Sequence, residues 1–498
     1  MKYFSLFLLF AEIFFPSNPR IKAKYASLDP QSISHNLAFY RLYPETKEGQ
    51  LALERIIKLL GPSYKMQELP EIALEPIIAL VNRREATLPS ISENELELIE
   101  RLSSHLHNRM LKGHQTFKLE EILLLPPNEI DVARALLLAE SSLEIARVYE
   151  ASLDLMALQI QAHLSPQATP YEKIRAISHF IFHEMRFRFP PQAVSIKDID
   201  VYTFLPSVID KRRGVCLGVS ILYLCLAQRL GLNLQAVTPP GHIYVRYLEE
   251  GKEELNIETT ARGIHVPSER YLGMQVKTLQ IRTLKEVVGL AFMNQASVSF
   301  KNEEYGKAIA QYEKALLFLP DDILLQQLLG FNYLLNGNPA KGKELLQKIQ
   351  NKIPDYALGP DTLIIDYLDQ KVDIEGIKAI FMEMNGRRES ILAKQKKLEE
   401  VLQKYPKFRS GLLALASCWI LQGREKEALI FLQKYEDIDP NDPLINYYLS
   451  TLSLQRFDYT AAWRYYRAAE RLSLQQDHHP YALKELKRQL ISVCPCHN

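Results

Sequence analysis

Cysteine is scarce in this chain, and its scarcity excludes a fold that is held together by disulfide bonds. The 498 residues include only five cysteines, at positions 216, 225, 418, 494 and 496. Disulfide-held scaffolds are short and far denser in cysteine. The fold must therefore rest on the packing of apolar side chains.

An excess of either charge is also missing. Lys and Arg total 60 against 59 Asp and Glu, so the formal net charge is +1. Proteins that bind nucleic acids usually carry a basic surplus or a basic patch, and these totals announce neither. We therefore expect no nucleic-acid partner. The length alone predicts roughly three domains, at about 150 residues each.

Long apolar runs are absent too, because no later segment reaches the ~18 uninterrupted apolar residues of a membrane-spanning helix. At the amino terminus, Lys2 precedes a mostly apolar run over residues 3–11, which Glu12 breaks and which resumes over residues 13–15. This length is typical of the apolar region of a signal peptide. We predict that residues 1–26 are a signal peptide or an anchor, so that the protein is exported or membrane-associated through this segment alone. The alternative is a cytoplasmic protein with a buried or fraying amphipathic helix here.

Helical spacing of apolar residues dominates residues 27–151. Ser92 and Glu95 have the form of a capping box at the start of a helix. Prolines separate the helical runs, and no catalytic signature occurs among them. The segment is therefore expected to be a helical domain that packs on or covers the next one. The positions that show this spacing include Leu51, Leu53, Ile56, Ile57, Leu59, Leu60, Leu96, Leu98, Ile99 and Leu102.

The pattern changes within residues 152–282. Gly214 precedes a mostly apolar helical run over residues 215–230, which Gly231 ends in the usual carboxy-terminal position. Two short runs with period-two alternation follow, at residues 242–248 and 255–260, and each is typical of a strand. A long helix followed by a hairpin indicates an α+β domain.

Cys216 is the first candidate for chemistry, because it lies in the first turn of the predicted helix 215–230. Free backbone N–H groups and the helix dipole stabilise an anion at this position. Arg212 and Arg213 add positive potential, and such settings lower a cysteine pKa from ~8.5 into the nucleophilic range. The alternative is a small buried apolar residue, a description that Cys225 fits well.

His242 is the candidate base. It follows a Pro-Pro-Gly turn at the start of a predicted strand, where it can face the start of the helix that carries Cys216. Asn256 and Glu258 alternate onto one face of the next strand, so either side chain can accept the imidazole N–H and orient the ring. Nucleophile, base and orienting group together meet the description of a cysteine-hydrolase site. By itself, His242 would more often be a turn or capping residue.

The segment RRGVCLGVSILYLCLAQRLGLNLQAVTPPGHIYVRY at residues 212–247, with NIETTARG at residues 256–263, resembles the transglutaminase-like superfamily. The resemblance is closest to a bacterial subgroup that is often fused to tetratricopeptide repeats. It implies a papain/transglutaminase-like cysteine-enzyme core over residues 152–282, with Cys216 as nucleophile and His242 as base. The third family position is usually Asp, and here it is Glu258, whose side chain is one methylene longer; Asn256 is the alternative in that role.

Downstream of residue 284 the chain is helical and periodic. Ala308, Tyr312, Ala315 and Pro320 are matched 34 residues later by Gly342, Leu346, Ile349 and Pro354. This spacing resembles the tetratricopeptide repeat (TPR), with its period of ~34 residues. We predict an α-helical TPR solenoid over residues 285–475, a tail over 476–498, and an insertion or degenerate repeat between Pro354 and Pro406. Such repeats imply a protein or peptide partner.

These observations predict a cysteine-dependent acyl-transfer enzyme, an amide hydrolase or transglutaminase-like protein, with a TPR module for protein binding. The chemistry calls for no metal or organic cofactor. The alternative is a non-catalytic scaffold or regulator that uses a degenerate transglutaminase-like fold. In the tail, Cys494, Cys496 and His497 could bind a soft metal, but four ligands are wanted, and a flexible tail is the better interpretation.

Overall fold

The computed structural model describes residues 18–60, 77, 79–81, 89–190, 203–384 and 387–494. Residues 1–17 of the predicted signal or anchor segment lie outside the described residues. The rest of that segment belongs to helix α2 (Pro19–Ala26), none of whose residues is buried. Within the described ranges, no helix combines the length and the apolar character needed to cross a membrane.

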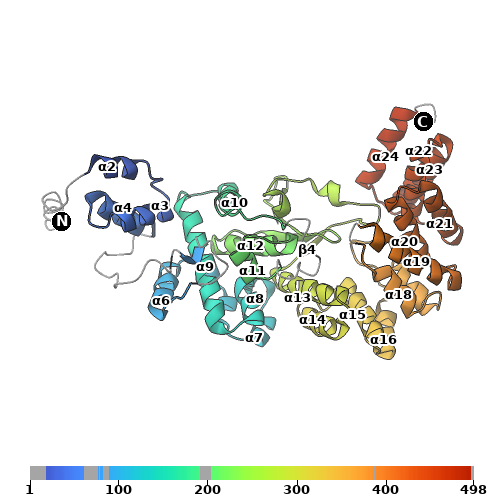
Figure 1. Cartoon of the computed structure of the whole chain (residues 1–498), viewed down its shortest axis with the longest axis horizontal. Coiled ribbons are helices and arrows are strands. Elements are labelled where there is room, and N and C mark those ends of the chain that lie inside the picture. Colours follow the sequence, from blue (N-terminus) through green and yellow to red (C-terminus); the bar gives the residue numbers. More distant parts are fainter. Residues whose placement is uncertain are drawn as a thin grey trace. The chain divides into compact units, whose positions relative to one another are not determined.

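The chain folds into two compact units, which Figure 1 draws in one colour sequence from end to end. The first unit comprises residues 1–190, 204–234 and 259–263, and the second comprises residues 191–203, 235–258 and 264–498. The segment that carries the candidate site therefore contributes to both units, its long helix to the first and its strands to the second.

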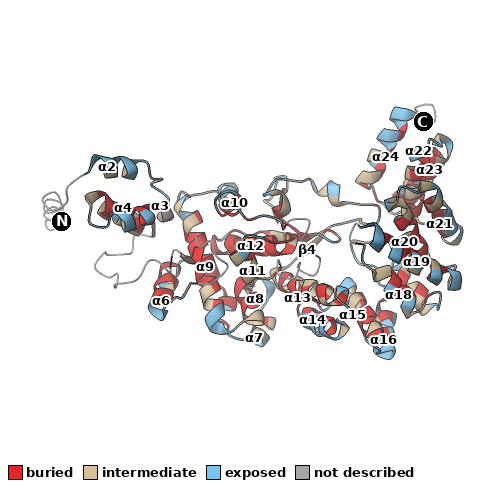
Figure 2. Ribbon diagram, viewed as in Figure 1, coloured by how far each residue is buried: buried red, intermediate tan, exposed pale blue. Residues whose placement is uncertain are grey.

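The first unit is helical, as expected for residues 27–151. Ser92 and Glu95 form the predicted capping box at the start of α6. Helices α9 and α12 are the most buried, as their red ribbons in Figure 2 show, and every residue from Leu217 to Arg229 is buried. A helix that is apolar on all sides belongs to the core. Besides α2, the described helices of this unit have the bounds α3 (Ile33–Leu42), α4 (Lys47–Leu60), α6 (Glu93–Leu102), η2 (His107–Met110), η3 (Lys112–Gln115), α7 (Leu119–Leu123), η4 (Pro127–Glu129), α8 (Val132–Glu140), α9 (Leu143–Ala162), α10 (Pro170–His179), η5 (Phe180–Glu184), α11 (Leu205–Lys211), α12 (Cys216–Arg229) and η8 (Thr259–Ala261).

A buried ion-pair cluster ties α9 to α12. Asp154 of α9 accepts hydrogen bonds from Arg229 Nε at 2.7 Å, from Ser103 Oγ at 2.9 Å and from Arg109. The side chains of Asp154 and Arg229 are both 0% exposed. Because an unpaired charge is costly in the protein interior, the two side chains hold each other in place.

The second unit contains a four-stranded sheet in the order β3-β2-β1-β4, in which all neighbours are antiparallel. Its strands are β1 (Gln235–Thr238), β2 (Tyr244–Tyr247), β3 (Leu255–Ile257) and β4 (Gln280–Arg282). The two predicted runs correspond to β2 and β3, which confirms the α+β class. The flanking strands β1 and β4 were not predicted.

The repeats of the second unit pack as pairs of neighbouring helices, α13 with α14, α15 with α16, α20 with α21, and α22 with α23. Small residues allow the close approach: a Cβ added to Gly342 would lie 2.8 Å from the carbonyl oxygen of Gly330. The predicted TPR solenoid is thereby confirmed. Helices α17, α18 and α19 occupy the irregular segment between Pro354 and Pro406. The bounds are α13 (Leu284–Lys301), α14 (Tyr305–Phe318), α15 (Ile323–Leu335), α16 (Pro339–Ile349), α17 (Thr362–Leu368), α18 (Ile374–Phe381), α19 (Arg388–Lys404), α20 (Arg409–Leu421), α21 (Glu425–Ile438), α22 (Pro443–Gln455), α23 (Tyr459–Gln475) and α24 (Tyr481–Val493).

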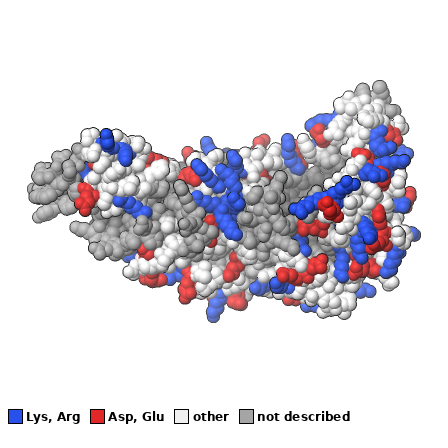
Figure 3. Space-filling view, in the orientation of Figure 1, with Lys and Arg blue, Asp and Glu red and all other residues white. Residues whose placement is uncertain are grey.

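The sheet and the repeats are joined by polar contacts within the second unit. Arg282 of β4 forms an ion pair with Asp322, the residue that caps α15, at 2.7 Å. The backbone N–H of Lys277 donates to Tyr356 O at 2.7 Å, and His478 Nε2 lies 2.8 Å from Gly273 O. The repeats therefore support the sheet directly. On the face drawn in Figure 3, basic and acidic side chains lie intermixed over the repeats.

Replacing Asp154 tests the ion-pair cluster of the first unit. Asp154→Ala leaves the buried guanidinium of Arg229 without its carboxylate, so we expect the free energy of unfolding to fall by about 3–5 kcal/mol. The measurement is urea denaturation followed by circular dichroism. Glu344→Ala is the control, because it removes an ion pair with Lys348 in which both side chains are 65% exposed. A midpoint for Asp154→Ala equal to that of the control would contradict the role of the cluster.

Candidate functional site

Cys216 is the first residue of α12, as the sequence predicts, and its side chain is partly exposed. The preceding chain is tightly packed: a Cβ on Gly214 would lie 2.8 Å from Val219 Cγ2. The backbone N–H of Cys216 has no hydrogen-bond acceptor within α12, because it lies in the first turn of the helix. This end of the helix is also the positive end of the helix dipole. The start of α12 therefore presents backbone N–H groups without intrahelical acceptors at the position of Cys216.

The two arginines before Cys216 have structural partners. Arg212 adopts a left-handed backbone conformation, with φ of 49°, where α11 ends. Its guanidinium donates to Val81 O at 3.1 Å and to Met185 O at 3.4 Å. Arg213 forms a backbone bridge with Arg188. Arg212 thus binds the loop before Cys216 to neighbouring segments of the first unit.

Cys225 lies deeper in α12 and is completely buried. Burial raises the pKa of its thiol to about 12, because the interior disfavours the thiolate. Cys225 is therefore a neutral core residue at physiological pH, and it provides an internal control for the reactivity of Cys216.

His242 and Glu258 meet in the second unit. His242 Nε2 lies 2.7 Å from Glu258 Oε2, and the two side chains are 25% and 7% exposed. The Pro-Pro-Gly turn holds the histidine: Gly241 has φ of 71°, and the backbone N–H of His242 donates to Pro239 O at 3.0 Å. Because a carboxylate oxygen only accepts hydrogen bonds, this contact orients the imidazole with its proton on Nε2.

Asn256 has a different set of partners. Its side chain accepts from Arg246 Nε at 2.9 Å and donates to Val266 O at 2.8 Å and to Ser268 Oγ at 2.9 Å. Asn256 and Arg246 are directly opposite in the β2–β3 ladder. Of the two orienting residues that the sequence offers, the structure brings Glu258 into contact with His242, while Asn256 belongs to a polar cluster around Arg246.

Tyr271, at the end of η9 (Ser268–Tyr271), joins the pair although sequence reasoning did not select it. Its hydroxyl donates to Glu258 Oε2 at 2.6 Å. Its ring stacks on Tyr244 at 4.8 Å between centroids and on His242 at 5.9 Å. Tyr271 lies in an irregular segment without periodicity, so no sequence signal marked it.

Cys216 belongs to the first compact unit, whereas His242, Glu258 and Tyr271 belong to the second. The structure thus brings His242 and Glu258 together within one unit and places Cys216 at a helix start in the other. The pairing of Cys216 with His242 stays a prediction.

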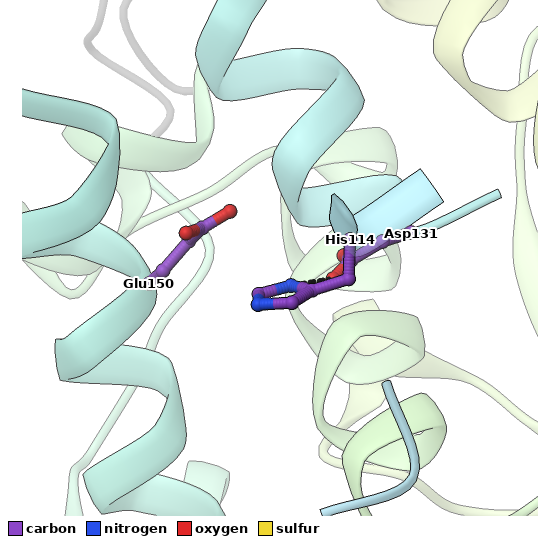
Figure 4. A group of neighbouring side chains, drawn as sticks. All are labelled: His114, Asp131 and Glu150. Atoms are coloured by element: carbon purple, nitrogen blue, oxygen red, sulfur yellow. Dashed lines mark hydrogen bonds and ion pairs between the residues drawn. The ribbon is translucent and has the colours of Figure 1, made fainter. Parts of the chain in front are cut away.

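A second polar group in the first unit has the residue types of a metal site. Ligand atoms of His114, Asp131 and Glu150 lie within 4.8 Å of one another, and all three residues are buried (Figure 4). His114 Nδ1 is 2.9 Å from Asp131 Oδ2. However, Arg134 binds both oxygens of Glu150, and Arg109 Nη1 lies 2.9 Å from His114 Nε2.

Two guanidinium groups therefore occupy the positions from which a cation would be bound, and the group does not fit a metal. Burial pushes the pKa of Asp131 upward, but the hydrogen bond from His114 and the positive charge of Arg229 outweigh it and hold that pKa well below its usual value. Burial raises the pKa of Glu150, although the ion pair with Arg134 opposes the rise. These residues form a structural ion-pair network.

In the tail, Cys494 is described, whereas Cys496 and His497 lie outside the described residues.

Comparison with known protein families places this site in context. The model of the transglutaminase-like superfamily matches residues 147–283, a range that contains Cys216, His242 and Glu258. The chain carries a transglutaminase-like domain. The expected resemblance is thereby confirmed. A comparison with curated proteins found no match.

Solved structures similar to this chain are TPR proteins. MamA is 16% identical, with a TM-score of 0.21, and the match covers 38% of this chain and 97% of MamA. The TPR2AB domain of yeast Sti1, in a complex with pHSP90, is 17% identical, with a TM-score of 0.21 and coverage of 41% and 84%. A TPR protein from Parabacteroides merdae is 15% identical, with a TM-score of 0.23 and coverage of 41% and 71%. At these scores, the TPR assignment rests on the helix pairs and their spacing.

The partners of Asn256 predict a structural role for this residue in the transglutaminase-like domain. Asn256→Ala removes one of the acceptors of the buried Arg246, and we expect a loss of stability of about 1–3 kcal/mol. Thermal unfolding measured by circular dichroism tests this. Glu253→Ala, at an exposed position of the same hairpin, is the control. If both variants melt with the parent protein, the polar cluster around Asn256 does not stabilise the hairpin.

Proposed function

We propose that this protein is a cysteine-dependent acyl-transfer enzyme that acts on an amide, with Cys216 as nucleophile, His242 as base and Glu258 as the group that orients His242. The observation that carries the proposal is the 2.7 Å contact between His242 and Glu258 inside a transglutaminase-like domain. A carboxylate that binds one imidazole nitrogen orients the ring and stabilises the imidazolium that forms when the histidine accepts a proton.

The chemistry assigned to each group is as follows. Cys216 gives its thiol proton to His242 Nδ1, and its sulfur forms a bond to the amide carbonyl carbon. Backbone N–H groups at the start of α12 stabilise the resulting oxyanion. The C–N bond then breaks as the imidazolium returns the proton to the leaving amine. Water or a second amine completes the transfer by attacking the thioester, with hydrolysis as the favoured outcome.

A chain connection supports the pairing of the nucleophile with its base. Ser220, four residues after Cys216 on α12, shares a hydrogen bond of 2.9 Å with Thr259. Thr259 directly follows Glu258 in the chain. Residues four apart lie on the same face of a helix, so within the first unit this bond anchors Thr259 on the face of α12 that carries Cys216.

The TPR pairs are proposed to bind a protein or peptide, because stacked helical repeats present an extended surface that suits a polypeptide. In this arrangement the repeats deliver a substrate or a regulator to the transglutaminase-like domain. The ion pair between Arg282 and Asp322 supports this coupling, since it connects an edge strand of the sheet to the cap of a repeat helix.

Labelling by a thiol reagent tests the nucleophile. We expect iodoacetamide at neutral pH to modify Cys216 far faster than Cys225, because the thiolate is favoured at a helix start and disfavoured in the core. Peptide mass spectrometry after timed labelling measures both rates.

In an acyl-transfer assay, Cys216→Ala and His242→Ala should each abolish activity, since such residues act as a unit. Glu258→Gln should reduce it by about 10²- to 10⁴-fold.

Cys225→Ala is the matched control for these variants, and it should retain both activity and the labelling of Cys216. Full acyl transfer by Cys216→Ala would exclude the enzymatic proposal and leave a binding protein. Should Glu258→Gln be silent while Asn256→Ala is inactive in a folded protein, the orienting role would belong to Asn256.

Hydrogen exchange tests the role of the repeats. For a protein that binds the purified full-length chain, we expect the complex to slow amide exchange in residues 284–475, because binding to the helix pairs buries their surface. Mass spectrometry of proteolytic peptides locates the protection. Residues 93–162 of the first unit serve as the internal control. Protection confined to that control region would contradict the assignment of partner binding to the repeats.

A further inference from the structure

The His242–Glu258 pair has a third member that the proposed roles do not use. Glu258 Oε2 receives two contacts, from His242 Nε2 at 2.7 Å and from the hydroxyl of Tyr271 at 2.6 Å. Both contacts fall on one oxygen atom. Each hydrogen bond to a carboxylate oxygen withdraws negative charge from it, so the two donors compete for the same charge.

The phenol of Tyr271 is suited to act as a permanent donor. Burial and the hydrogen bond to Glu258 both raise its pKa above the ordinary value of 10.0. Tyr271 therefore keeps its proton throughout the physiological range, and the hydroxyl continues to donate to Glu258 whichever protonation state His242 adopts.

The ring of Tyr271 is held by its neighbours. It stacks on Tyr244 with an interplanar angle of 21° and on His242 with an angle of 20°. The hydroxyl of Tyr244 is engaged elsewhere, by Arg246 Nη2 at 2.9 Å and by Ser268 at 3.4 Å. Tyr244 thus positions the ring of Tyr271 without contributing a hydroxyl to Glu258.

We propose that Tyr271 is a positioning residue which limits the negative charge that Glu258 presents to His242, and so keeps the imidazole able to release its proton. This proposal rests on the proposed roles of His242 and Glu258. A carboxylate that bound only His242 would stabilise the imidazolium more strongly. The leaving amine would then have to take its proton from a weaker acid. Tyr271 thereby allows His242 both to accept the proton of Cys216 and to release it to the leaving amine.

Among the residues that the structure describes, the titratable and charged groups shown near Glu258 come from three elements of the second unit. His242 and Tyr244 belong to β2 and the turn before it, Glu258 follows β3, and Tyr271 ends η9. Arg246 of β2 lies farther along the same face, where Glu254 neutralises it at 3.0 Å. The hydroxyl of Tyr271 is therefore the neighbour of Glu258 whose removal changes the charge on Oε2 without removing an ionised group.

The decisive measurement is the pKa of His242, obtained by nuclear magnetic resonance titration of its ring in the Cys216→Ala background. The resonance is assigned by its loss in His242→Gln. Tyr271→Phe should raise this pKa by about half a unit, because Glu258 then holds the imidazolium more tightly. Glu258→Gln should lower it. Tyr244→Phe is the matched control: it removes a hydroxyl from the same stack and should leave the pKa of His242 unchanged.

An unchanged or lowered pKa of His242 in Tyr271→Phe would overturn the proposal. If Tyr271→Phe does not fold, as judged by circular dichroism, Tyr271→Met also removes the hydroxyl and should raise the pKa in the same direction. The titration needs neither a substrate nor the thiol. A failure of Cys216 to act as a nucleophile would thus be seen in the labelling experiment and would leave this result intact.

Discussion

The first unit depends on a buried ion pair. Asp154 and Arg229 are both 0% exposed, and their 2.7 Å contact fixes the carboxy-terminal end of α12 against α9. The rest of α12 is buried among apolar side chains, so the helix has little freedom to slide or rotate. Cys216 is at the opposite end of this helix, and its position follows from that restraint. The polar cluster thus supports the proposed site indirectly, by fixing the helix that carries Cys216.

The second unit shows a comparable dependence of a small sheet on a large helical array. The strands have only three or four residues each, and strands so short are marginal without further support. Arg282 of β4 obtains that support from Asp322 at the cap of α15. The same sheet carries His242 and positions Glu258. The repeats are therefore part of the framework of the proposed site, in addition to their proposed role in binding a partner.

Periodicity predicted the large elements well. The helix of residues 215–230 and the paired repeat helices agree with the structure, because each buries one face or all faces in a regular pattern. The two alternating runs contain β2 and β3 but were predicted too long, since the second run ends in the 3-10 helix η8. The strands β1 and β4 escaped prediction. Three or four residues are too few to establish alternation, and these strands exist because neighbouring strands satisfy their backbone groups.

The sequence by itself determined which residues are available for chemistry: a cysteine at a helix start, a histidine on a rigid turn, and two polar residues that alternate onto one face. Alternation left both Asn256 and Glu258 able to orient His242, because it reports a face and nothing about neighbours, and only the family resemblance favoured Glu258. Only the tertiary structure decided which of them contacts His242. The strand register sets Arg246 opposite Asn256, and the buried guanidinium takes the amide as its partner. Glu258, beyond the end of β3, contacts His242 and Tyr271. Tyr271 lies in an irregular segment whose sequence shows no periodic pattern, so it could not be predicted.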